Sequence, residues 1–190
     1  MSRSDLELCF MPATEAISQF KEKKLSPVEL LSEIIKRTED VNPKTNAFNY
    51  TCFDEALSQA KIAEKKYSNG QDNLLPLEGI PLAIKDEVGI KGQPNKNGSL
   101  IYKDYVAEKT DIDVESLTRS GAVIHARSCN PEFSLTSFRH SKVNGVTRNP
   151  WNLDMTPGGS SGGSGASLAT GCTTLATGSD IGGSIRIPAS

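Results

Sequence analysis

This 190-residue chain carries two Gly-Ser clusters close together, GGSSGGSG at residues 158–165 and GSDIGGSIR at residues 178–186. Glycine permits backbone conformations and close approaches that a Cβ atom forbids. Each cluster also places serine hydroxyls beside bare backbone N–H groups. Acyl-transfer chemistry needs both, the hydroxyl as a nucleophile and the N–H groups to hold an oxyanion. The two clusters therefore predict two neighbouring turns that take part in chemistry.

Three other interpretations of the first cluster compete with this one. A flexible Gly/Ser linker has such a composition, but here an Asn-Pro-Trp segment at residues 149–151 precedes the cluster and small residues suited to packing follow it. A phosphate-binding loop needs Gly-Lys-Ser/Thr, and no lysine follows Lys142. A nucleophile elbow would centre on Ser161, with its histidine later in the chain. Both histidines precede Ser161, and we expect His125 in the core and His140 in a loop.

A lysine is the alternative base for a serine nucleophile. Its amine must be neutral, and its unperturbed pKa of about 10.4 has to be lowered by burial or nearby positive charge. Lys85 ends the apolar run at residues 79–84, which predicts a buried strand. Asp86 would point to the opposite face, whereas Glu87 would share the face of Lys85 and raise its pKa. An exposed lysine at a strand end is the common alternative.

Composition restricts the class of protein. The net charge of −2 and the isoelectric point near 5.8 give no basic surface for nucleic acid, and 36% hydrophobic residues suit one globular domain. No apolar run has the length of a signal peptide or a membrane span, which predicts a cytoplasmic protein. The cysteines form no C-x-x-C pair and have no histidine cluster beside them, so we expect free thiols and no zinc site. They are Cys9, Cys52, Cys129 and Cys172.

Alternating helices and strands indicate an α/β fold. The clearest signal is a capping box at Ser26 and Glu29 with Pro27 in the first turn, before a helix that Pro43 should end. We expect Asp54 to cap another helix. Helices are predicted at residues 14–23, 26–42, 111–120 and 166–170, and from Asp54 through Ala63 up to a polar loop at 68–76. Strands are predicted at 46–51, 79–85, 121–126 and 173–177.

The ordered motifs together resemble the amidase signature family. The two Gly-Ser clusters match its signature, and GIPLAIKD at residues 79–86 is similar to its lysine strand. The resemblance implies the N-terminal part of that fold, with a mixed sheet flanked by helices. Intervening segments also fit, at residues 121–124, 130–133 and 147–151. The implied organisation is one partial amidase domain over residues 1–190, with a helical part at 1–70 and a signature and catalytic part at 79–190.

The resemblance also implies a Ser–cis-Ser–Lys triad. Ser184 would be the acyl-forming nucleophile, Ser160 the bridging serine after a cis peptide bond, and Lys85 the base. Protons would pass from Ser184 through Ser160 to Lys85 and return to the leaving amine. No cofactor or metal is implied. The backbone N–H groups of Ile181, Gly182, Gly183 and Ser184 would form the oxyanion hole, and Ser161, Asp180 and Arg186 would support the two turns.

The implied function is an amidohydrolase that cleaves a linear carboxylic amide, with a small-molecule amide as its substrate. The alternatives are an amidotransferase subunit that releases ammonia from glutamine or asparagine for a tRNA-charging complex, and a non-catalytic fragment. CNPEF at residues 129–133 is more similar to the hydrolases, because the amidotransferase subunits more usually carry MDEF there. Members of the family are longer, so we expect the chain that stops at Ser190 to be incomplete and inactive alone.

Overall fold

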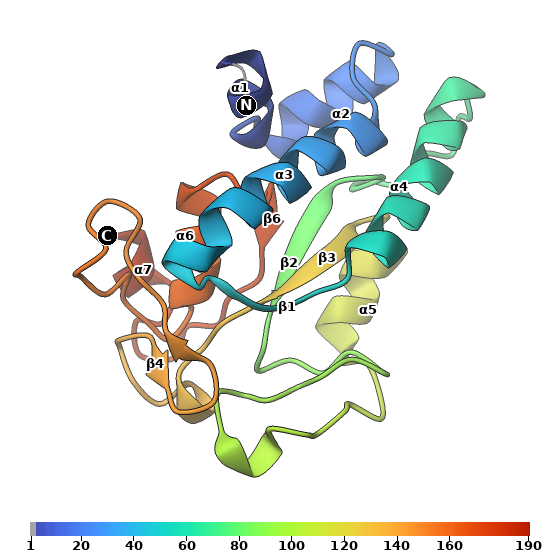
Figure 1. Cartoon of the computed structure of the whole chain (residues 1–190). Helices are drawn as coiled ribbons and strands as arrows, with labels where there is room; N and C mark the ends of the chain where they lie inside the picture. Colours follow the sequence, from blue (N-terminus) through green and yellow to red (C-terminus); the bar gives the residue numbers. More distant parts are fainter. Residues whose placement is uncertain (1–2) are drawn as a thin grey trace.

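A four-stranded mixed sheet lies at the centre of the computed structural model, which describes residues 3–190 (Figure 1). Strand β2 runs parallel to β3 and β6, whereas β1 runs antiparallel to β3. The predicted α/β class with a mixed sheet is confirmed. The first two residues of the predicted 1–70 part lie outside the described residues. The sheet order is β1 (Phe48–Thr51), β3 (Val123–Ser128), β2 (Pro81–Lys85) and β6 (Leu175–Ala176), and a separate ribbon pairs β4 (His140–Ser141) with β5 (Gly145–Val146).

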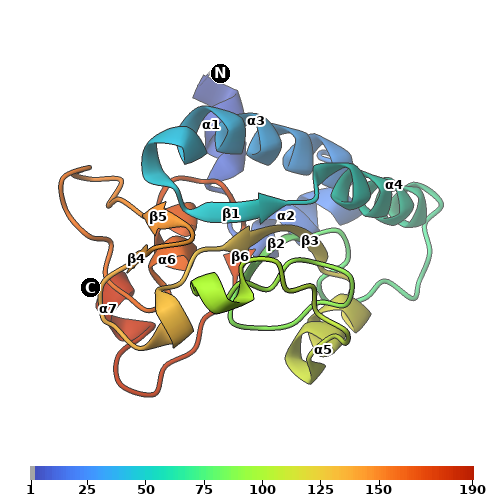
Figure 2. The same cartoon turned by 60° about the horizontal axis from the view of Figure 1, so that its bottom comes forward.

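Helices cover both faces of the sheet. Figure 2 shows α3 on one side of the sheet and α5 on the other. None of the helices among residues 3–190 combines the length and apolar character needed to cross a membrane. The helices are α1 (Arg3–Cys9), α2 (Ala13–Lys21), α3 (Pro27–Thr45), α4 (Phe53–Ser68), α5 (Ile112–Arg119), α6 (Gly162–Ala169) and α7 (Arg186–Ala189), with short 3-10 helices η1 (Leu100–Tyr102) and η2 (Glu132–Ser134).

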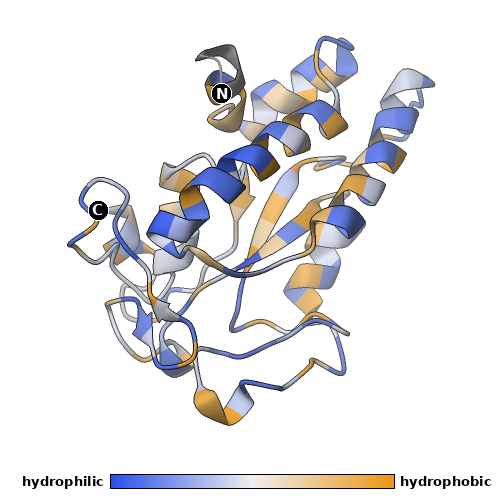
Figure 3. Cartoon of the chain, in the orientation of Figure 1, coloured by the Kyte–Doolittle hydropathy of each residue, from blue (hydrophilic) through white to orange (hydrophobic). Residues whose placement is uncertain are grey.

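Strand β2 is buried on both faces, which explains the apolar run that precedes Lys85. Ala83 packs in a cluster with Val41 of α3, whereas Leu82 and Ile84 pack in another with Val114 of α5. In Figure 3, hydrophilic residues cover much of the visible side of α3, while β2 is largely hydrophobic. Because no face of β2 reaches solvent, the polar residue at its end is enclosed by protein.

Most predicted element boundaries shift by one or two residues, as from 121–126 to Val123–Ser128 for β3, and three differences have a local cause. Helix α3 continues past Pro43 to Thr45. A proline in the last turn removes only one backbone hydrogen bond, and the next turn is still closed because Asn46 N donates to Asn42 O at 2.7 Å. The N-cap of α4 is Cys52, so Asp54 lies in the first turn. Helix α6 begins four residues earlier than predicted, at Gly162 instead of Ala166, because Gly163 packs directly against the backbone of Cys129 and Ala47. Helix α1 was not predicted at all.

The predicted capping box of α3 is confirmed, and it supports a stability prediction. Ser26 Oγ accepts from Glu29 N at 3.1 Å, and Glu29 Oε2 accepts from Ser26 N at 2.8 Å. We expect Ser26→Ala to lower the free energy of unfolding by about 1 kcal/mol in chemical denaturation. Ser32→Ala is the control, since its hydroxyl bonds only the helical carbonyl of Val28. An equal loss in both variants would contradict the capping assignment.

Candidate active site

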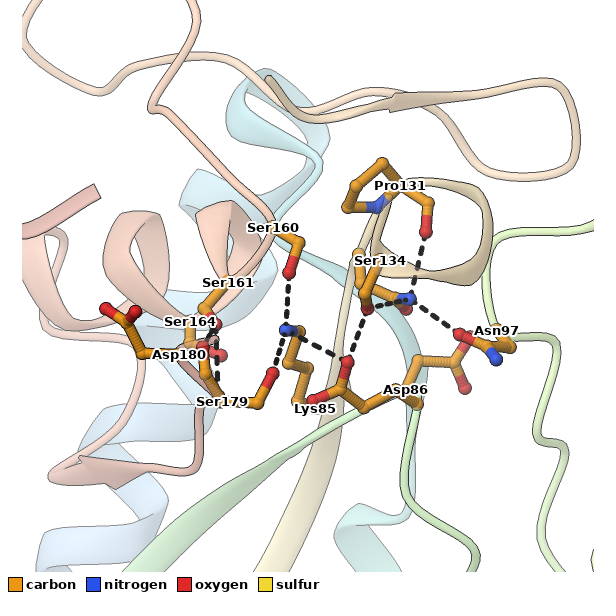
Figure 4. A network of polar contacts seen from close by, with 12 residues as sticks. Lys85, Asp86, Asn97, Pro131, Ser134, Ser160, Ser161, Ser164, Ser179 and Asp180 are labelled. Atoms are coloured by element: carbon orange, nitrogen blue, oxygen red, sulfur yellow. Dashed lines mark hydrogen bonds and ion pairs between the residues drawn. The ribbon is translucent and has the colours of Figure 1, made fainter. Parts of the chain in front are cut away.

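The amine of Lys85 lies at the end of β2 and is completely buried. Its Nζ atom is 2.7 Å from Ser160 Oγ, 2.8 Å from Ser179 Oγ and 3.1 Å from Glu87 Oε2. Figure 4 shows the amine between Ser160 and Ser179, which come from different Gly-Ser clusters. The structure therefore brings together the lysine strand and both clusters that the sequence singled out.

The parallel strands explain why these groups meet. The carboxyl ends of β2 and β6 lie at the same edge of the sheet, where α/β proteins commonly build their sites. Just beyond β6, Thr177 N donates to Ala83 O and Thr177 Oγ1 accepts from Lys85 N, both at 2.9 Å. These two bonds fix the second cluster beside the end of β2.

The first cluster reaches Lys85 through a tight turn before α6. The peptide bond between Gly159 and Ser160 is cis, and Ser160 is fully buried. A Cβ at residue 159 would lie 3.0 Å from backbone atoms of Thr136 and Phe138, so only glycine fits this turn without displacing the neighbouring loop.

Burial lowers the pKa of the Lys85 amine, because removal from water disfavours the ammonium form. The charge of Glu87 and its hydrogen bond oppose this shift without overcoming it. Burial would raise the pKa of Glu87, but hydrogen bonds from Ser134 and Ser179 and the charge of Lys85 lower it overall. Glu87 is therefore held as a carboxylate beside an amine that gives up its proton more easily than an ordinary lysine.

The second turn is docked on the first by direct bonds. Ser161 N donates to Ser184 O at 3.1 Å, and the Ser161 hydroxyl makes two 3.4 Å contacts with the backbone of Ser179. The side chain of Ser161 is turned away from Lys85 in Figure 4, whereas Ser160 points at it. Ser161 therefore bonds the backbone of the second turn and not the Lys85 amine.

Asp180 organises the backbone around Ser184. Its carboxylate accepts from the N–H groups of Gly183 at 2.7 Å, Ile185 at 3.1 Å and Arg186 at 3.0 Å. The Arg186 guanidinium also bonds it at 2.9 Å, and hydrogen bonds from Arg186, together with those from the turn, hold the pKa of Asp180 well below its usual range. Gly183 has a φ of 114°, a conformation that favours glycine.

The predicted oxyanion N–H groups differ in their availability. Gly183 N–H is committed to Asp180. The N–H groups of Ile181, Gly182 and Ser184 make no hydrogen bond to any residue in the described range 3–190. Ile181 is fully exposed, and Ser184 is partly buried.

Other residues that the sequence singled out can be located in the structure. Asp86 points away from Lys85 as predicted, and its carboxylate is 3.7 Å from Arg127. His125 is a core residue as predicted, bonded to Thr173 at 3.0 Å, with a pKa that burial lowers to about 3. His140 was expected in a loop but lies in the short strand β4. All four cysteines are buried, and none of them is in a disulfide bond with another described residue. Within residues 3–190 no three His, Cys, Asp or Glu side chains gather as metal ligands do.

Two contacts of the site were missed by sequence reasoning. Ser179 contacts Lys85 directly, although its place inside the second cluster was the only signal for it. Ser134 donates a short hydrogen bond to Glu87 from the distant loop around η2, for which no local pattern exists. Long-range packing brings Ser179 to the Lys85 amine and Ser134 to the carboxylate of Glu87.

The sequence and fold both match known proteins. A family model described as Amidase matches residues 29–190, so the chain belongs to the amidase family. The expected resemblance is confirmed by relatives. The chain is 39% identical over 177 residues to an indoleacetamide hydrolase of Bradyrhizobium diazoefficiens, covering 93% of this chain and 34% of that one. It is 40% identical over 185 residues to a glutamyl-tRNA(Gln) amidotransferase subunit from Geobacter metallireducens, covering 97% and 38%.

The fold agrees equally well with a solved structure. A fatty acid amide hydrolase superposes with a TM-score of 0.93 at 28% identity, covering 100% of this chain and 33% of that one. The chain therefore spans about a third of the length of the proteins that it matches.

Proposed function

We propose that this chain carries the acyl-transfer site of an amidohydrolase, which cleaves a linear carboxylic amide through an acyl-Ser184 intermediate. The observation that carries the proposal is the 2.7 Å contact between Lys85 Nζ and Ser160 Oγ in a fully buried position. A buried lysine bonded to a serine hydroxyl suits a base better than an ion-pair partner on the surface. Membership of the amidase family supports the reaction class.

The proposed relay moves protons without any net change in the enzyme. Neutral Lys85 accepts the proton of Ser160, and Ser160 accepts the proton of Ser184. Ser184 Oγ bonds to the amide carbon. When the C–N bond breaks, the proton returns through the same groups to the leaving amine, and water then releases the acid by the same route.

The tetrahedral oxyanion would be held by backbone N–H groups of the second turn. Those of Ile181, Gly182 and Ser184 are free of bonds to the described residues, so they are the donors that this proposal uses first. Gly183 N–H would join them only by leaving Asp180, which with Arg186 supports the turn. One such donor is worth about 3 kcal/mol of barrier.

Lys85→Met provides the test. With the 190-residue chain, ammonia release from small carboxamides and hydroxamate formation in the presence of hydroxylamine report hydrolysis and acyl transfer. We expect Lys85→Met to slow both by a factor of about 10² to 10⁴, because the relay loses its base. Lys66→Met is the matched control, since Lys66 forms an ion pair with Glu78 away from the site. Equal rates in wild type and Lys85→Met would refute the relay.

A second candidate is release of ammonia from glutamine or asparagine for tRNA-dependent amidation. It is favoured by the relative from Geobacter, whose name describes an amidotransferase subunit. Ammonia release from glutamine that depends on added partner subunits would support it, whereas hydrolysis of simple amides by the chain alone supports the hydrolase. A cytoplasmic location and the division at residues 70 and 79 stay predictions.

A further inference from the structure

Glu87 is built into the site although the relay does not use it. Its Oε2 atom is 3.1 Å from Lys85 Nζ, and the Ser134 hydroxyl donates a short hydrogen bond to the same oxygen. The Lys85 side chain is completely buried and that of Glu87 is 19% exposed, so solvent screens this pair much less than a surface ion pair.

A second chain of contacts fixes the carboxylate of Glu87 in place. Asn130 Nδ2 donates to Ser134 Oγ at 3.1 Å and to Asn97 Oδ1 at 2.9 Å, as Figure 4 shows for the labelled Asn97 and Ser134. Ser134 has a φ of 57°, which is uncommon for a residue other than glycine. The loop therefore holds its hydroxyl against Glu87 in a backbone conformation that its own sequence does not favour.

The other groups around the amine are neutral or engaged elsewhere. From the turn before α6 it meets the neutral hydroxyl of Ser160, and from the turn after β6 that of Ser179. On β3, Ser128 faces Ser164 of α6 at 2.7 Å, and both are neutral. The remaining charges nearby are paired, Asp86 with Arg127 and Asp180 with Arg186. Among residues 3–190, Glu87 is the only charged group in contact with Lys85.

We propose that Glu87 is a positioning residue of the relay, whose carboxylate stabilises the ammonium that Lys85 becomes when it accepts the proton of Ser160. This inference rests on the proposed function. The charge created at Lys85 is buried, and a fixed carboxylate 3.1 Å away offsets part of the loss of hydration. Glu87 thus does for the lysine what the carboxylate of a Ser-His-Asp triad does for its imidazolium.

The direction of the effect follows from the charges. Without the Glu87 carboxylate, burial alone acts on the amine, so the pKa of Lys85 falls further. The neutral amine then exists at lower pH, and the acid limb of kcat/KM moves to lower pH. The amine is also a weaker base, so the rate on the plateau falls. A merely structural defect would lower the rate without moving the limb.

Glu87→Gln tests the inference because it keeps the shape of the side chain and removes its charge. The midpoint of Lys85 is read directly by NMR of the chain labelled with ¹³C at lysine Cε, and Lys85→Met identifies the signal. We expect the midpoint to fall by about 1 pH unit or more, and the acid limb of hydrolysis to move with it. Glu132→Gln is the matched control, since Glu132 bonds Ser99 and does not touch Lys85.

Each outcome decides the inference. An unchanged or raised midpoint in Glu87→Gln overturns it, even where hydrolysis proceeds through Ser184. A lowered midpoint in a chain that hydrolyses no amide supports the ion pair and refutes the proposed function alone. If Glu87→Gln fails to fold, Glu87→Asp decides, because its shorter carboxylate keeps the charge at a greater distance and should lower the midpoint by a smaller amount.

Discussion

Ser184→Ala should abolish acyl transfer by this chain, with a loss of amide turnover of about 10⁶-fold. In the proposed mechanism only Ser184 Oγ bonds covalently to the substrate, so neither Lys85 nor Ser160 replaces it. The variant should keep its fold, because the contact that docks Ser184 uses its carbonyl oxygen, which accepts from Ser161 N at 3.1 Å. Turnover of a carboxamide measures hydrolysis, and the mass of peptides after reaction with an activated ester shows whether Ser184 becomes acylated.

Ser190→Ala is the matched control for this experiment. Ser190 lies six residues beyond the proposed nucleophile, and its hydroxyl bonds only Ile187 O, at 2.9 Å. We therefore expect normal turnover in this variant and an acyl group on the peptide that contains Ser184. Turnover that survives in Ser184→Ala would refute the acyl-Ser184 intermediate. A wild-type chain without any turnover would refute the proposed function for these residues.

The sequence predicted the lysine for reasons that are local. An apolar run that ends in a charged residue indicates a buried strand with its functional group at the end, and the two-residue period of a strand placed Glu87 on the face of Lys85 and Asp86 on the other. The contacts of the two carboxylates agree with these directions, but the strand period is not their cause, because β2 ends at Lys85 and a turn closed by the bond from Val88 N to Lys85 O places both side chains. The alternative of an exposed lysine is wrong, since Lys85 is completely buried.

The remaining parts of the site depend on contacts that no local pattern contains. Ser134 reaches Glu87 across 47 positions of sequence, and its left-handed backbone is set by the loop around η2. The choice of Ser160 over Ser161 came from resemblance, because both are serines flanked by the same glycines. Only the structure distinguishes their environments, one at the Lys85 amine and the other at the backbone of Ser179.

The start of α6 was missed for a related reason. Glycine has a low helix propensity, so the run at residues 162–165 predicts a loop. In the structure Gly163 N donates to Cys129 O at 3.1 Å, and the helix lies directly against the end of β3. Close packing of backbone on backbone outweighs propensity here, and it carries Ser160 and Ser161 to the edge of the sheet.

Gly163→Ala should destabilise the protein by about 3 kcal/mol, near the upper end of what overpacking usually costs. A Cβ at this position would lie 2.5 Å from both Cys129 N and Cys129 O and 2.6 Å from Ala47 O. These are backbone atoms of the sheet edge, so no side chain can rotate to relieve the contacts. The free energy of unfolding from chemical denaturation measures the loss.

The sign of the change separates this packing from helix propensity. If α6 stood free of the sheet, alanine in place of Gly163 would stabilise the helix by about 1 kcal/mol, so a gain in stability would contradict the close approach. Gly182→Ala is the control for stability, because a Cβ there meets nothing within 4 Å. It should change the free energy of unfolding by no more than about 0.5 kcal/mol. Displacement of α6 would also move Ser160 away from Lys85, so we expect Gly163→Ala to lose amide turnover along with stability.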